Sequence, residues 1–208
     1  MTEILARLAP LDEAWFRAIN RGLHEWSREA PWVESFLRFT NEFGSAWVLV
    51  AIFVGILAFS PNAREGFRRT AELGLGALLG GFGANRLKGV FERPRPRFGV
   101  SSGFADGEVF FGFGESYRSF SFPSGHSALA FSVAAVLIWW ATDIPDPRRR
   151  AIVRAASLLG AALTGLSRIY AGSHYPADVL AGAGLGLLGG GVVVAASRRL
   201  LGPYPPRT

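Results

Sequence analysis

Half of the 208 residues are apolar and 18% are charged, whereas a soluble domain carries roughly 25% charged residues. This composition excludes a disordered chain and argues against an ordinary water-soluble globule. The length fits a single domain, 1–208. The sequence contains no Cys, which excludes disulfides, thiol nucleophiles and Cys-ligated metal sites.

Residues 1–30 are predicted to form an amphipathic N-terminal arm. Apolar residues recur at helical spacing from Leu11 to Leu23 and form a one-sided stripe. Trp15 and Trp26 suit a helix that lies at a membrane surface. The alternative is an amphipathic helix that packs on its own protein.

Five apolar stretches follow the arm, at about 40–59, 73–84, 128–141, 155–166 and 179–196. A helix needs about 20 residues to cross a bilayer. Two of the stretches are dense in Gly, and small residues let membrane helices approach closely. We therefore expect an all-α integral membrane bundle of five to six transmembrane helices plus the N-terminal amphipathic helix. A sixth span would have to come from residues 11–30.

The basic residues are spread over the connectors between these stretches. Segments 61–69, 142–154 and 197–208 carry 10 of them and lie on one side of a five-span bundle. The positive-inside rule assigns that side to the cytoplasm, so loops 85–122 and 167–178 face the periplasm or the cell exterior. No single basic face emerges from the net charge of +6, so we expect a cell (inner) membrane protein without a nucleic-acid partner.

The outward loops hold the residues suited to phosphate chemistry. They contain the only Lys of the chain, Lys88, and two of its three His, His126 and His174. Ionisable groups near a membrane are costly and are candidates for function. Lys and Arg suit a phosphate. Ser124 and Gly125 are predicted to open a helix, whose free N–H groups favour an anion.

The two His provide one group to attack or accept a proton and another to donate one. His174 and Asp178 are four residues apart, so on a helix they share a face, and Asp178 can then hold a ring nitrogen of His174. Asp178 and Glu92 do not make a two-metal site. We therefore expect metal-free phosphoryl transfer through a phosphohistidine, without a cofactor.

Three blocks within 88–178 carry a resemblance to a known family. The blocks occur in order and with the family's internal spacing. They are Lys88-x6-Arg95-Pro96, Pro123-Ser124-Gly125-His126 and Ser167-Arg168-x5-His174-x3-Asp178. Together they resemble the signature of the type 2 phosphatidic acid phosphatase superfamily, whose membrane members dephosphorylate lipid phosphates and diphosphates without a metal.

The resemblance implies a role for each signature residue. His174 is the implied nucleophile, Asp178 its partner and His126 the general acid for the leaving group. The implied phosphate-binding groups are Lys88, Arg95, Arg168, the Ser124 hydroxyl and the Gly125 amide. Arg93 and Arg97 lie beside the signature without belonging to it, and we interpret them as surface charges or headgroup contacts.

The expected function is hydrolysis of a lipid phosphate at the outer face of the membrane, with undecaprenyl diphosphate as the expected substrate because the chain is compact. Phosphatidylglycerophosphate and phosphatidic acid are the alternative substrates, and a lipid phosphotransferase would use the same intermediate. A soluble haloperoxidase of the same superfamily is disfavoured by the apolar stretches. A non-catalytic transporter or scaffold would lack phosphate release. The long 98–122 loop is expected to act as a lid over the lipid headgroup.

Overall fold

The computed structural model describes residues 3–98, 112–113, 118 and 120–204. Within this part the chain forms seven α-helices, three short 3-10 turns and no strand. The helices are α1 (Glu3–Glu29), α2 (Trp32–Asn41), α3 (Ala46–Phe59), α4 (Ala63–Phe91), α5 (Gly125–Trp140), α6 (Pro147–Tyr170) and α7 (Pro176–Leu201). The turns are η1 (Glu42–Gly44), η2 (Pro96–Phe98) and η3 (Ala141–Asp143). Most of the predicted 98–122 lid lies outside the described residues.

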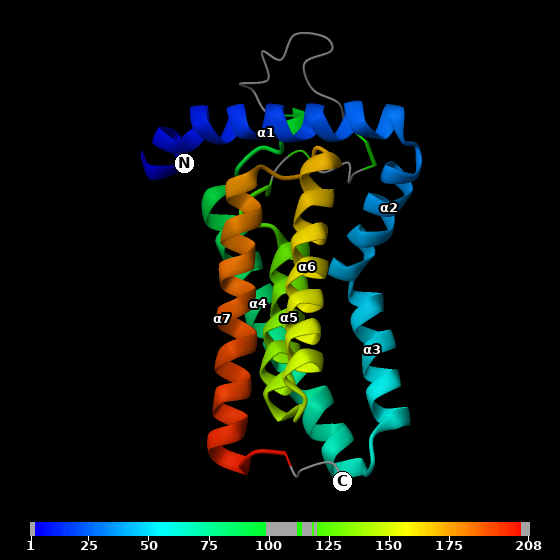
Figure 1. The fold of residues 1–208 in the computed structure, drawn as a ribbon. Coiled ribbons are helices and arrows are strands. Elements are labelled where there is room, and N and C mark those ends of the chain that lie inside the picture. Colours follow the sequence, from blue (N-terminus) through cyan, green and yellow to red (C-terminus); the bar gives the residue numbers. More distant parts are fainter. Residues whose placement is uncertain (1–2, 99–111, 114–117, 119, 205–208) are drawn as a thin grey trace.

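The helices α3 to α7 run side by side along the length of the molecule, and α1 lies across one end of them (Figure 1). The chain descends through α2 and α3, returns through α4, and then alternates through α5, α6 and α7. Each of the five predicted apolar stretches lies in one of these passes. The ends of α4 and α6 and the starts of α5 and α7 therefore meet beneath α1.

Fewer helices are long and apolar enough to span a membrane than the five to six expected. Among the described residues, Gly125–Asp143, Pro147–Tyr170 and Pro176–Leu201 are long and apolar enough. A fourth span results if Trp32–Gly44 and Ala46–Phe59, which are bent by 68°, cross together. The helix α4 has sufficient length, but charged side chains near both ends and glycines in its middle reduce its hydropathy. The predicted all-α bundle with membrane-spanning helices is confirmed.

Glycines bring the helix backbones into direct contact at the centre of the bundle. A Cβ atom placed on Gly76 of α4 would lie 3.1 Å from the Cα of Gly190 of α7. One placed on Gly186 of α7 would meet the carbonyl oxygen of Ala128 of α5. The Gly-dense stretches thus allow the close approach predicted from the sequence.

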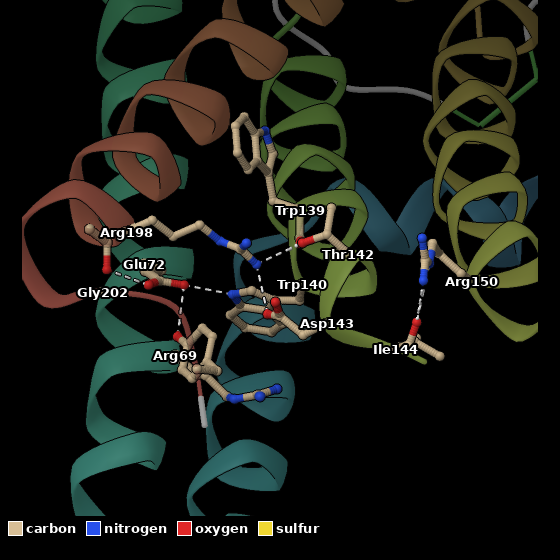
Figure 2. A network of polar contacts seen from close by, with 12 residues as sticks. Arg69, Glu72, Trp139, Trp140, Thr142, Asp143, Ile144, Arg150, Arg198 and Gly202 are labelled. Atoms are coloured by element: carbon tan, nitrogen blue, oxygen red, sulfur yellow. Dashed lines mark hydrogen bonds and ion pairs between the residues drawn. The ribbon is translucent and has the colours of Figure 1, made fainter. Parts of the chain in front are cut away.

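A buried polar network joins α4, α5 and α7 at the end opposite α1 (Figure 2). Its centre is Glu72, which is 2% exposed. The Glu72 carboxylate accepts hydrogen bonds from Trp140 Nε1 at 2.6 Å and the Tyr204 hydroxyl at 2.9 Å, and pairs with Arg68 Nε at 3.0 Å. A buried carboxylate is stable only with such partners. The network holds the segment after α7 against α4.

The helix α1 docks on the bundle through residues spaced four apart. Asp12, Phe16 and Asn20 are buried, while Trp15 and Trp26 on another face are about half exposed. The predicted N-terminal amphipathic helix is confirmed, as α1. One face packs on the protein itself, and the exposed Trp side chains remain suited to a membrane surface.

Candidate active site

His174 lies in the turn between α6 and α7 and is 1% exposed. Its Nδ1 atom is 2.7 Å from the carbonyl oxygen of Ser121. A carbonyl oxygen only accepts hydrogen bonds, so Nδ1 carries the proton and Nε2 carries the lone pair. The His174 amide donates to the carbonyl of Arg168 at 3.3 Å, which fixes the turn on the end of α6. The ring is therefore held in the tautomer that leaves Nε2 nucleophilic.

Asp178 lies in the first turn of α7 and is fully buried. Its carboxylate accepts from the Tyr175 amide at 2.8 Å, from the Ser121 hydroxyl, and from Nη1 of Arg93 at 2.7 Å. The distance from its Oδ2 atom to Nδ1 of His174 is 3.6 Å. The carboxylate faces the ring, but His174 precedes α7, so the two residues do not share the helix face that their spacing predicts. The Ser121 carbonyl, not Asp178, accepts the direct hydrogen bond. Asp178 acts on His174 through its charge.

Burial keeps His174 neutral. Removal from water lowers the pKa of His174 from its usual 6.5 to about 4. The positive charges of Arg168 and Arg95 also lower this pKa, while Asp178 raises it. At neutral pH the imidazole therefore has an available lone pair, which a nucleophile needs.

The start of α5 joins the other two signature blocks. The Ser124 hydroxyl caps the helix by accepting from the Ser127 amide at 3.3 Å, and the Ser124 amide donates to the Asp178 carbonyl at 2.9 Å. A Cβ atom placed on Gly125 would lie 3.6 Å from Nζ of Lys88, which lies in the last turn of α4. The predicted helix start is confirmed, and the only Lys of the chain reaches it.

Arg95 and Arg168 are buried cations beside His174, at 3% and 2% exposure. Nη1 of Arg168 donates to Oδ1 of Asn41 at 2.9 Å, which orients the guanidinium from the end of α2. Among the described residues, no group of three or more His, Asp or Glu side chains has the arrangement of a metal site. The groups there that suit a phosphate are the guanidinium groups and Lys88.

His126 lies in the first turn of α5 and is half-buried. A Cβ atom on Gly44 of η1 would lie 2.7 Å from the Cβ of His126. Only a glycine fits there, so η1 packs directly behind this turn. The structure thus brings all eight predicted site residues to the end of the bundle beneath α1 (Figure 1).

The interpretation as a surface charge or headgroup contact is wrong for Arg93, whereas Arg97 is half-buried. Arg93 is 5% exposed and pairs with Asp178. Nη2 of Arg97 donates to the carbonyls of Gly112 at 2.9 Å and Ala171 at 3.2 Å. The acceptors of these two arginines are distant in the sequence, so no local sequence pattern indicated the contacts.

Three further residues at the site were not identified from the sequence. Ser121 contacts the signature residues His174 and Asp178 directly. Asp12 pairs with Arg93 and accepts from the Ala177 amide, and Asn41 orients Arg168. A signal existed only for Asp12, which begins the four-residue repeat of docking residues on α1.

Comparisons with known proteins identify the family of the chain. The profile of the PAP2 superfamily matches residues 69–201. The chain belongs to the PAP2 superfamily. It is 33% identical over 166 residues to phosphatidylglycerophosphatase B of Bacillus subtilis (strain 168), covering 76% of this chain and 72% of the relative.

Two solved PAP2 neighbours have the same fold. The transmembrane PAP2-type phosphatidylglycerolphosphate phosphatase from Bacillus subtilis superposes with a TM-score of 0.68 at 26% identity, covering 93% of this chain and 88% of the other. LpxE of Aquifex aeolicus superposes with a TM-score of 0.65 at 28% identity, covering 88% and 93%. The resemblance seen in the sequence is confirmed, and this PAP2 protein is a membrane-embedded lipid phosphatase.

Proposed function

We propose that this PAP2 protein hydrolyses a lipid phosphomonoester through a phosphohistidine on His174. The observation that carries the proposal is the ring of His174, neutral and held with Nε2 free of the proton, beside the cations Arg95 and Arg168. A nucleophile next to fixed positive charge suits attack on a phosphate.

The proposed reaction has two steps. In the first, Nε2 of His174 bonds to phosphorus, the bond from phosphorus to the lipid oxygen breaks, and His126 gives that oxygen a proton. In the second, His126 takes a proton from water, the water oxygen bonds to phosphorus, and the bond to Nε2 breaks. The helix start at Ser124 and Gly125, with Lys88, Arg95 and Arg168, neutralises the phosphoryl oxygens.

The proposed substrate is phosphatidylglycerophosphate. The support is the 33% identity to phosphatidylglycerophosphatase B and the structural match to a phosphatidylglycerolphosphate phosphatase. Undecaprenyl diphosphate, the substrate expected from the sequence, rests on the compactness of the chain alone. It therefore serves as the competing substrate in the test.

The test measures phosphate release from both lipids in detergent, with and without EDTA. The proposal expects release that survives EDTA, is faster with phosphatidylglycerophosphate and is lost in His174→Ala. Faster phosphate release from undecaprenyl diphosphate would overturn the assignment of phosphatidylglycerophosphate as the substrate. Release that EDTA abolishes, or that His174→Ala retains, would overturn the mechanism.

A lipid phosphotransferase would form the same intermediate and pass the phosphoryl group to an acceptor hydroxyl. The two are distinguished by adding a lipid alcohol and analysing products by mass spectrometry. If the product is a phosphorylated alcohol and not free phosphate, the protein is a phosphotransferase and not a hydrolase.

We also propose that the site faces the periplasm or the cell exterior. The starts of α4 and α6 and the end of α7, which carry basic residues, lie at the end of the bundle opposite α1 (Figure 1), and the positive-inside rule assigns such an end to the cytoplasm. Because the chain has no Cys, single exposed cysteines can report topology. In intact cells, a membrane-impermeant maleimide should label Arg21→Cys on α1 and leave Arg148→Cys unlabelled; the reverse pattern would invert the orientation.

A further inference from the structure

Arg93 is a buried cation between two carboxylates from different helices. Its Nη1 atom is 2.7 Å from Oδ1 of Asp178 on α7, and its Nη2 atom is 2.8 Å from Oδ2 of Asp12 on α1. The guanidinium also lies 3.9 Å above the ring of Tyr175. One rigid, planar group thus fixes both carboxylates at once, which a flexible ammonium group does not do.

Asp12 contacts the start of α7 a second time. Its Oδ1 atom accepts from the amide of Ala177 at 2.8 Å. The same carboxylate therefore binds Arg93 and caps the helix that carries Asp178. Buried carboxylates are rare unless they are paired in this way.

The rest of the buried face of α1 packs against the turn that carries His174. Phe16 packs edge-on against Tyr175, with ring centroids 5.5 Å apart. Nδ2 of Asn20 donates to the carbonyls of Ile169 at 3.1 Å and Tyr170 at 3.2 Å. The helix α1 therefore contacts both sides of the turn, at the end of α6 and at the start of α7.

We propose that Arg93 and Asp12 are positioning residues, which couple the seating of α1 to the orientation of Asp178. Ser121, whose hydroxyl donates to Asp178 and whose amide donates to the Arg93 carbonyl, passes this on to the ring of His174 through its own carbonyl. This inference rests on the proposed function and deepens it. The N-terminal arm is then part of the support of the active site as well as a covering helix. Arg93 is buried and its guanidinium is paired with two carboxylates, so on this proposal it acts on the chemical step and not on substrate binding.

The test compares purified variants in detergent with phosphatidylglycerophosphate as the substrate. Arg93→Met removes the charge, Arg93→Lys keeps it without the planar fork, and Asp12→Asn removes one of the two carboxylates. Arg68→Met is the matched control, because Arg68 pairs with the buried Glu72 at the opposite end of the bundle. All rates are expressed per folded protein, measured by size-exclusion chromatography.

We expect Arg93→Met to lower kcat by about 100-fold, the cost of a displacement of about 1 Å at a reacting group, with KM unchanged. Arg93→Lys should recover part of kcat. Asp12→Asn should lower kcat on its own and add little to Arg93→Met, because both act through one contact. Arg68→Met should lower the Tm and leave kcat unchanged. A normal kcat in Arg93→Met, or an equal loss of kcat in Arg68→Met, would overturn the positioning role.

A second measurement does not depend on turnover. Amide hydrogen exchange in Arg93→Met should rise in both residues 11–24 and residues 173–178, and should stay at the wild-type level at the far end of the bundle. Unchanged exchange in either segment would overturn the coupling. If the wild type releases no phosphate while exchange rises as expected, the proposed function fails and the link between α1 and the turn stands.

Discussion

The contact between α4 and α7 predicts that Gly189→Ala destabilises the bundle. A Cβ atom on Gly189 would lie 2.8 Å from the amide nitrogen of Gly80 and 3.0 Å from the carbonyl oxygen of Gly76. Ordinary contact begins at 3.4 Å, so the two helices would have to part by about 0.6 Å. Both obstructing atoms belong to the backbone, and no side chain can rotate away.

The magnitude follows from two opposing effects. Overpacking of a tight core lowers the free energy of unfolding by about 1–3 kcal/mol. The higher helix propensity of Ala over Gly raises it by up to about 1 kcal/mol. We therefore expect a net loss of about 1–2 kcal/mol in the free energy of unfolding. Lys88 lies two turns beyond Gly80 on the same helix, so kcat should fall by less than the roughly 100-fold of a 1 Å displacement.

Gly184→Ala is the matched control. It changes the same residue type on the same helix, but nothing lies within 4 Å of its Cβ position. Thermal unfolding of both variants in one detergent, followed by phosphate release, tests the prediction. The Tm should fall in Gly189→Ala and stay level or rise in Gly184→Ala. Equal Tm values would refute the argument that backbone contact holds α4 against α7.

Three further predictions concern protonation and the far end of the bundle. The pKa of about 4 for His174 predicts that the enzyme's own contribution to kcat/KM falls only as the pH drops towards 4. Measuring kcat/KM against pH for two monoesters with different second phosphate pKa values would separate the ionisation of the enzyme from that of the substrate. A decline centred near pH 6.5 with both substrates would contradict the prediction. Because the unfolded chain binds a proton at His174 near pH 6.5 and the folded chain near 4, stability should decrease by about 3 kcal/mol as the pH falls across this interval. Chemical unfolding should show this decrease in the wild type and not in His174→Gln. Glu72→Gln should lower stability by about 3 kcal/mol, because Arg68 loses its buried counter-ion, and should leave kcat per folded protein unchanged; a lower kcat would imply that the network also supports the site.

Much of the fold could be predicted because its signals are local. Apolar length predicts the helices, and glycine density predicts where they touch. The helix start at Ser124 follows from a cap residue that bonds three residues ahead. The signature residues could be identified because their spacing is fixed within each block.

The supporting contacts could not be predicted, because they join residues far apart in the chain. Arg93 and Asp178 are 85 residues apart, and Ser121 and Asp178 are 57 apart. In the sequence, nothing distinguishes Arg93 from the other Arg residues of the same basic segment. Its burial depends on a carboxylate from α1, which becomes a neighbour only after the arm has folded across the bundle. Nδ1 of His174 donates to a backbone carbonyl, and every residue has one, so the residue types do not reveal this contact.

The contact between His174 and Ser121 also bears on how long a phosphorylated enzyme would last. A peptide carbonyl cannot take the Nδ1 proton, and Asp178 already accepts from three donors. On the proposed path the ring therefore keeps that proton and becomes a cation once phosphorus joins Nε2. A cationic phosphorylated ring leaves as neutral imidazole, whereas a neutral phosphorylated ring would have to leave as an imidazolate anion. Water therefore breaks the bond between phosphorus and Nε2 easily. The Asp178 charge at 3.6 Å stabilises the cation while it exists, so Ser121 and Asp178 together would set the balance between an intermediate that forms and one that is quickly released.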